Sequence, residues 1–130
     1  MRRRLTIMGA LFATVLAFAP PPARANEKFI VFFYTLSAEL DPAAQDVVAA
    51  AIAYAKQNAA MQVDIIGSAS TDGSQQANLQ LSLLRAQQIK DLMAAGGIAA
   101  SRLMRVGEGE VNTVGTAEEA RRVEIIVRAP

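Results

Sequence analysis

The chain has 130 residues, with 13 basic and 12 acidic side chains, and it contains neither cysteine nor histidine. The lack of cysteine excludes disulfides and thiol nucleophiles, and the lack of histidine excludes a Ser-His-Asp triad and the commonest zinc ligand. The acidic residues are scattered rather than grouped at the spacing of a metal site, so the sequence predicts no enzyme, no metal site and no cofactor.

Residues 1–25 are predicted to form a cleavable secretory signal peptide. Three arginines at positions 2–4 precede an apolar run over residues 5–19, and Ala23-Arg24-Ala25 supplies the small-x-small pattern of a cleavage site. A membrane anchor is the competing interpretation, but the run is shorter than the roughly 20 residues that a span needs. The pair Arg2-Arg3 also leaves a twin-arginine export route open.

Cleavage after Ala25 would leave residues 26–130 as a single domain. Four of the 13 basic residues lie in the removed segment, which leaves 9 basic against 12 acidic residues and a net charge of −3. A negative net charge does not favour binding to nucleic acid. No transmembrane segment is expected in the mature chain. The signal peptide predicts export from the cytoplasm.

The first half of the mature chain predicts a strand, a helix and a second strand. Residues 28–35 are apolar and rich in aromatic and β-branched side chains, as is typical of a buried strand. Asp41-Pro42 predicts the start of a helix that ends near Asn58, and its apolar residues recur at steps of three and four. Residues 61–67 predict the second strand.

The second half predicts a long helix and two further strands. The helix extends over residues 76–95 and stops at Gly96-Gly97, one of which is expected in the left-handed conformation. Residues 102–107 and 121–128 predict strands, with Val123, Ile125 and Val127 on one face, and residues 108–119 predict a polar loop. The expected fold class is α+β, a βαβαββ mixed sheet with two helices packed on one face.

Two segments are candidates for a binding site. Arg85 lies at the edge of the apolar stripe of the long helix, where its planar charged group suits a carboxylate; the alternative is a side chain that covers the core and keeps its guanidinium in water. Residues 67–74 form a polar loop before the same helix, which suits an anion or is an ordinary turn. In this loop Asp72 either holds an ammonium group or caps the helix.

Arg121 and Arg122 begin the last predicted strand. Because successive side chains of a strand alternate, one arginine is expected to face solvent and the other the surface of the sheet. Charged pairs at strand starts are usually solvated, so this pair alone predicts no site.

These patterns resemble the OmpA-like C-terminal domain family, the periplasmic peptidoglycan-binding module of outer-membrane proteins, Pal lipoproteins and flagellar stator proteins. The resemblance extends over residues 29–127, and residues 78–86 follow the family's Asn-x-x-Leu-Ser-x-x-Arg-Ala. Four shorter segments match in the same order: Ser37-Ala38-Glu39-Leu40, Val63-Asp64-Ile65-Ile66-Gly67, Gly107-Glu108-Gly109-Glu110 and Arg121-Arg122-Val123-Glu124-Ile125.

The resemblance implies a site for the diaminopimelate side chain of peptidoglycan, in which an arginine holds the carboxylate and an aspartate holds the ammonium. The arginine corresponds to Arg85 and the asparagine at the helix start to Asn78. At the position of the family's aspartate this chain has Ser70. The nearest acidic residue along the sequence is Asp72, two positions later. A second family aspartate corresponds to Leu36, and the family's Asn-Arg-Arg to Ala120-Arg121-Arg122.

The resemblance therefore implies a noncatalytic domain that binds peptidoglycan noncovalently through the peptide stem, with a partly degenerate site at Arg85, Asn78, Ser70, Asp72 and Arg121. The alternative is an envelope structural or protein-interaction domain that kept the fold and lost the ligand, which the residues at Leu36, Ser70 and Ala120 favour. Envelope proteins are then possible partners. A hydrolase is disfavoured by the absence of histidine and cysteine.

Overall fold

The computed structural model describes residues 26–71, 74–110 and 117–130. In chain order the elements are β1 (Glu27–Phe32), α1 (Pro42–Gln57), β2 (Gln62–Ala69), α2 (Gln75–Ala95), a 3₁₀ turn (Ala100–Arg102), β3 (Leu103–Glu110), α3 (Ala117–Ala120) and β4 (Arg122–Arg128).

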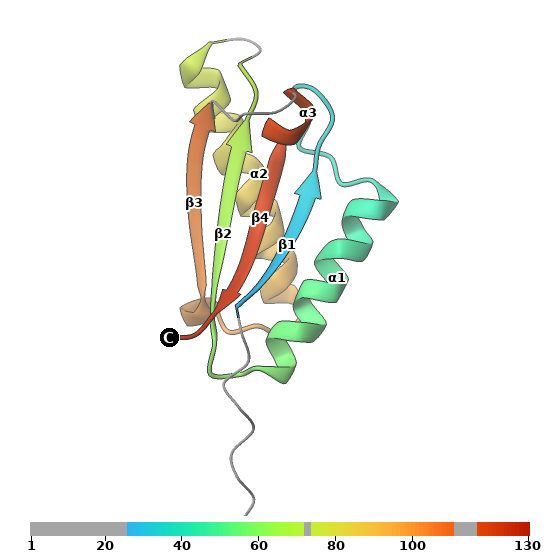
Figure 1. Ribbon diagram of the computed structural model, residues 1–130, viewed down its shortest axis with the longest axis vertical. Helices are drawn as coiled ribbons and strands as arrows, with labels where there is room; N and C mark the ends of the chain where they lie inside the picture. Colours follow the sequence, from blue (N-terminus) through green and yellow to red (C-terminus); the bar gives the residue numbers. More distant parts are fainter. Residues whose placement is uncertain (1–25, 72–73, 111–116) are drawn as a thin grey trace, which may run out of the picture.

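The four strands form one mixed sheet in the order β1-β4-β2-β3. Strand β4 is antiparallel to both β1 and β2, whereas β2 and β3 are parallel. Helix α2 lies across one face of the sheet and α1 lies beside β1 (Figure 1). The predicted fold class is confirmed: the domain is a βαβαββ mixed sheet with its two long helices on one side.

Local sequence signals set the ends of both helices. The Asp41 carboxylate accepts a hydrogen bond from the Ala44 N–H at 2.8 Å, with proline at the first helical position, and Asn58 ends α1 as predicted. Ser74 caps α2 through the Ala77 N–H at 3.1 Å. Gly97 adopts a φ of +101°, which confirms the left-handed residue expected after α2.

The core lies between the inner face of the sheet and the two helices. Val123, Ile125 and Val127 of β4 are fully buried, so the predicted inner face of this strand is confirmed. Each aliphatic side chain of this kind stabilises the fold by about 1.5–3 kcal/mol when fully buried. The helices add small and aliphatic side chains to the same cluster: Ala44, Val48, Ala51 and Ala55 from α1, and Ala86, Ile89 and Met93 from α2.

Three strand ends differ from the sequence prediction by two or more residues. Strand β2 continues to Ala69, so the first residues of the loop predicted over 67–74 belong to the strand. Strand β1 ends at Phe32 rather than at position 35, because the Ser37 N–H bonds to the Tyr34 carbonyl at 3.1 Å and closes a turn. Strand β3 continues to Glu110 because it pairs with Ser68 and Ala69 beyond a bulge in the parallel ladder. The segment predicted as a loop also contains α3, and its residues 111–116 lie outside the described part.

Candidate functional site

The site is built where α2 crosses the end of β2. A Cβ atom at Gly67 would lie 2.0 Å from the Ser82 carbonyl oxygen, so only glycine lets the helix approach the strand this closely. The Ser82 hydroxyl donates to the Leu79 carbonyl at 2.7 Å and accepts from the Gly109 N–H at 3.0 Å. This close approach places Arg85, one turn further along α2, directly against the ends of β1 and β2.

Arg85 is fully buried, and three backbone carbonyls accept hydrogen bonds from its guanidinium. Its Nε donates to Ser37 at 2.8 Å, its Nη2 to Tyr34 at 3.0 Å and its Nη1 to Ser68 at 3.1 Å. Arginine carries five N–H groups, so at most two remain for any other partner. The interpretation of Arg85 as a side chain with its head in water is wrong, because the guanidinium lies inside the protein.

The carbonyls that Arg85 contacts belong to the turn over residues 34–37. Leu36 occupies the third position of this turn with a φ of +54°, a conformation that non-glycine residues adopt at a cost of roughly 1–2 kcal/mol. Its side chain is 66% exposed and that of Tyr34 is 67% exposed, so no apolar burial offsets this strain. Arg85 instead holds both ends of the turn through the two carbonyls.

The environment of Arg85 weakens its positive charge without removing it. Burial, and then the nearby charge of Arg121, lowers the pKa of Arg85 to about 10. The guanidinium carbon lies 5.0 Å from the centre of the Phe33 ring, and this cation–π contact partly replaces the lost hydration. Arg85 is therefore a buried cation at neutral pH.

Arg121 is the second cation of the site. Its Nε donates to the Phe33 carbonyl at 3.2 Å, and its own carbonyl accepts from the Phe33 N–H at 2.8 Å. Its side chain is half-buried, and its two Nη atoms have no protein partner among the described residues. The adjacent Arg122 differs, because its guanidinium bonds to Glu124 at 3.3 Å and to the Glu119 carbonyl at 2.6 Å.

The other predicted site residues are placed as follows. Ser70, at the end of β2, and Asn78, in the first turn of α2, are buried, and each interacts with another part of the chain. Asp72 lies outside the described residues. Ala120 is buried in α3 immediately before Arg121, so an asparagine there would have to fit into a closed space.

The two arginines form an electropositive position, and a described carboxylate close to their partners is that of Glu108, which accepts from the Ser68 hydroxyl at 3.4 Å. In residues 26–71, 74–110 and 117–130, no ion pair joins Arg85 or Arg121 to an acidic side chain. The described residues also contain no group of three or more metal-ligating side chains. An anion beside Arg121 would find free N–H donors on Arg121 and the buried charge of Arg85 behind them.

Sequence reasoning missed one feature of this site: the motif residue Ser82 joins α2 to β3, a role that no spacing rule indicates. Arg121 was expected in the site only through the resemblance to the family's Asn-Arg-Arg, because the pair Arg121-Arg122 at the start of a strand was given no weight on its own. The alternation of these two side chains along the strand is the signal that the residues themselves provide.

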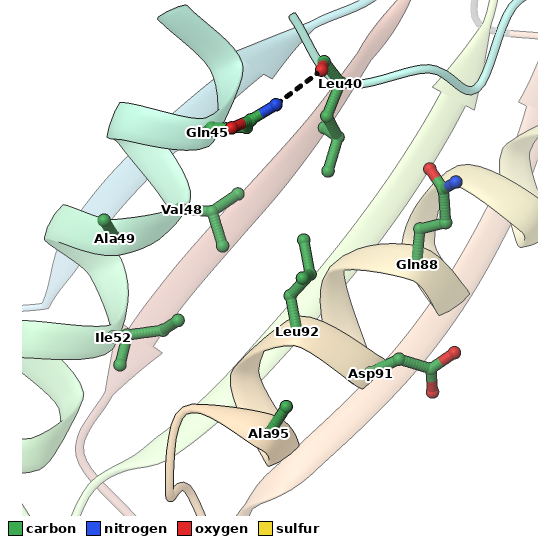
Figure 2. Close-up of a pocket in the computed structure, with 9 residues that line it drawn as sticks. All are labelled: Leu40, Gln45, Val48, Ala49, Ile52, Gln88, Asp91, Leu92 and Ala95. Atoms are coloured by element: carbon green, nitrogen blue, oxygen red, sulfur yellow. Dashed lines mark hydrogen bonds between the residues drawn. The ribbon is translucent and has the colours of Figure 1, made fainter. Parts of the chain in front are cut away.

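Apart from this site, a groove of about 680 Å³ lies between α1 and α2. Val48 and Ile52 of α1 and Leu92 of α2 line it, and Figure 2 shows their side chains in the space between the helices. None of the predicted site residues that the structure describes lines this groove. No helix in the described part of the chain is long and apolar enough to cross a membrane.

Comparison with known proteins points to one family. The sequence profile of the OmpA family matches residues 32–125. No curated protein sequence matches the chain.

Solved structures share the fold. The OmpA-like domain of FopA1 from Francisella tularensis is 25% identical with a TM-score of 0.71, over 81% of this chain and 73% of that one. The peptidoglycan-associated lipoprotein from Burkholderia pseudomallei is 19% identical with a TM-score of 0.71, over 77% and 90%. The cell wall anchor of the T6SS from Pseudomonas aeruginosa is 24% identical with a TM-score of 0.68, over 83% and 85%.

Proposed function

Because this chain belongs to the OmpA family, whose profile matches residues 32–125, we propose that it binds peptidoglycan noncovalently in the periplasm. The ligand group is a carboxylate of the diaminopimelate-containing peptide stem. Arg121 holds this carboxylate with its free Nη atoms, and Arg85 supplies a buried positive charge and fixes the shape of the site. Residues 1–25 act as the signal peptide, and residues 26–130 form the mature single domain.

The observation that carries this proposal is the pair formed by Arg85 and Arg121 around Phe33. Both guanidinium groups contact Phe33, one over the ring and one at the carbonyl. Two cations that share a partly buried site, neither with an ion-pair partner among the described residues, favour the binding of an anion from outside. The similar structures support the choice of anion, since one is named a peptidoglycan-associated lipoprotein and another a cell wall anchor.

The proposal assigns different tasks to the residues of the family motif. Asn78, Ser82 and Arg85 are all buried, so they build the site from within and set the position of the turn over residues 34–37. Ser70, in place of the family's aspartate, brings no charge for the ammonium of the ligand. The site is therefore partly degenerate: it binds the carboxylate of the ligand but interacts more weakly with the ammonium.

A sedimentation assay with isolated sacculi tests this assignment. The secreted protein is compared with Arg121→Ala and with the matched control Arg122→Ala, whose side chain is already paired with Glu124. Loss of one charge-assisted contact costs about 1.5–3 kcal/mol, so Arg121→Ala should retain roughly 10- to 100-fold less protein on sacculi. Equal retention of both variants would contradict the role of Arg121.

A second comparison tests the peptide stem itself. Sacculi that carry lysine in place of diaminopimelate lack the side-chain carboxylate, and the wild-type protein should bind them more weakly by a similar factor. Equal binding to both kinds of sacculi would exclude that carboxylate as the ligand group, whatever the effect of Arg121→Ala.

One observation favours a second function, that of an envelope structural or protein-interaction domain. Tyr34 and Leu36 are large, apolar and mostly exposed at the rim of the site, as is typical of residues that a partner protein covers. Under this alternative the protein fails to bind sacculi, and Tyr34→Ser weakens cross-linking to an envelope protein in cells. In both functions the domain acts by binding, without catalysis.

A further inference from the structure

Strand β1 has one free edge. Within the described part of the chain it pairs only with β4, and the Phe33 N–H donates to the carbonyl of Arg121, the residue just before β4. Because backbone direction alternates in an antiparallel pair, Phe29 and Val31 also face β4, whereas the N–H and C=O groups of every second residue face outward. These outward residues are Lys28, Ile30 and Phe32, and their backbone groups have no partner among the described residues.

The first turns of α1 form a wall beside this edge. A hollow of about 110 Å³ lies between residues 30–32 of β1 and the side chains of Ala43, Ala44 and Val47. An apolar cavity of about 150 Å³ holds a benzene molecule, so this hollow has room for one small aliphatic side chain. An unpaired strand edge next to an apolar wall is the arrangement in which proteins bind extended peptides by strand addition.

Charge and shape select the occupant. Among the described residues that line the hollow, Asp41 alone is charged, and only one of its carboxylate oxygens is needed to cap α1 at the Ala44 N–H. A peptide with a basic residue at this end is therefore favoured. Helix α1 lies beside the free side of β1 (Figure 1), so a second folded copy that paired through its own β1 would bring its own α1 against this helix, whereas an extended peptide carries no helix.

We propose that the free edge of β1 and the wall of α1 bind an extended peptide segment of a partner protein as a fifth strand of the sheet. The segment carries small aliphatic side chains toward Ala43 and Val47 and a lysine or arginine next to Asp41. This surface is separate from the site around Arg121, and the inference does not depend on peptidoglycan binding.

The experiment is an NMR titration of the purified, ¹⁵N-labelled protein with the acetylated and amidated peptide Lys-Val-Thr-Ala-Thr-Val. We expect shift changes at the amides of Lys28, Ile30 and Phe32, together with at least tenfold slower hydrogen exchange at these amides. The same peptide, N-methylated at alternate residues in each of the two registers, cannot complete the ladder and should give no such protection.

Two exposed alanines of α1 provide a matched pair of variants. Ala43→Glu fills the hollow beside β1 and places a second carboxylate near Asp41, and we expect it to weaken peptide binding at least tenfold. Ala49→Glu makes the same change in the groove between α1 and α2, and we expect it to leave binding unchanged.

Three results would overturn the proposal. The first is the absence of any shift change at millimolar peptide. The second is a loss of binding in Ala49→Glu but not in Ala43→Glu, which would place the peptide between the helices. The third is protection of the β1 edge that rises with protein concentration in the absence of peptide, which would identify the occupant as a second copy of the chain.

Discussion

The guanidinium of Arg85 holds both ends of the turn in which Leu36 adopts a positive φ. Nη2 bonds to the Tyr34 carbonyl and Nε to the Ser37 carbonyl, and Leu36 lies between these two residues with a φ of +54°. A residue of α2 therefore fixes the shape of a loop about 50 positions earlier in the chain. The motif over residues 78–86, which indicates the family, therefore has a structural role in shaping the site.

Removal of the Arg85 side chain should destabilise the domain strongly. Arg85→Met leaves three carbonyls without their donor, one buried and two part-buried. An unsatisfied buried group costs about 1–3 kcal/mol, and the two part-buried carbonyls can regain water, so we expect the free energy of unfolding to fall by roughly 3–5 kcal/mol. Arg85→Lys should recover little, because a single ammonium cannot span the three acceptors. Urea unfolding measures both variants, with Arg105→Ala as the exposed control. A loss below about 1 kcal/mol in Arg85→Met would contradict the structural role.

The difference in stability between wild type and Arg85→Met should not change between pH 6 and pH 9. Burial, and then the charge of Arg121, lowers the pKa of Arg85 to about 10 in the folded state, so the side chain stays charged in both states over this range. Above about pH 10 the unfolded chain binds more protons than the folded chain, and the wild type should then gain stability relative to the variant. Urea unfolding in steps of pH checks the sign, and a difference that already varies near pH 7 would be inconsistent with it.

Substitutions at Leu36 should separate backbone strain from loss of side-chain contacts. Asparagine tolerates the left-handed conformation better than leucine, so Leu36→Asn should stabilise the domain by about 0.5–1 kcal/mol. Leu36→Val, with a β-branched side chain, should destabilise it by a similar amount. Since the position is mostly exposed, neither change removes a buried contact. Thermal unfolding of both variants gives the comparison, and shifts in the same direction would argue against strain.

Gly67→Ala should disrupt the contact between β2 and α2. The new Cβ would lie 2.0 Å from the Ser82 carbonyl oxygen, so the backbone of α2 has to move. We therefore expect the free energy of unfolding to fall by more than about 3 kcal/mol. Gly96→Ala is the comparison, because its Cβ would meet the Ile52 side chain at 2.9 Å and the Leu92 carbonyl at 3.3 Å, so the backbone has to give by only a few tenths of an ångström. Similar losses in the two variants would show that the close approach at Gly67 is not specific.

The sequence indicated the fold well because its signals are local. The cap at Asp41, the glycines after α2 and the alternation of Val123, Ile125 and Val127 act within a few residues, and the structure confirms each of them. The candidate site depends on contacts between distant residues instead. The bond from Arg85 to Tyr34 joins positions 51 residues apart, and no periodicity reports it. The left-handed Leu36 gave no signal either, because leucine is not a residue that predicts a positive φ.

The last prediction concerns the charge that the site lacks. Ser70 is buried directly after β2, two positions beyond Ser68, whose carbonyl accepts from Arg85. If the resemblance assigns Ser70 to the site correctly, Ser70→Asp adds a carboxylate to the electropositive position of Arg85 and Arg121, which favours its ionised form. If the ligand is the zwitterionic end of diaminopimelate, the new carboxylate can hold the ammonium, and binding to sacculi should rise by roughly 10- to 100-fold.

Ser70→Asn is the matched control for this prediction, because it has the same shape as aspartate without the charge. It should bind sacculi as weakly as the wild type. A fall in binding for Ser70→Asp alone would mean that the new carboxylate competes with the ligand for Arg121, so that the ligand is recognised as a simple anion. Equal binding of all three proteins would show that Ser70 does not belong to the site. A carboxylate next to the two arginines would change their affinity for any ion, so an added charge without effect has to lie elsewhere.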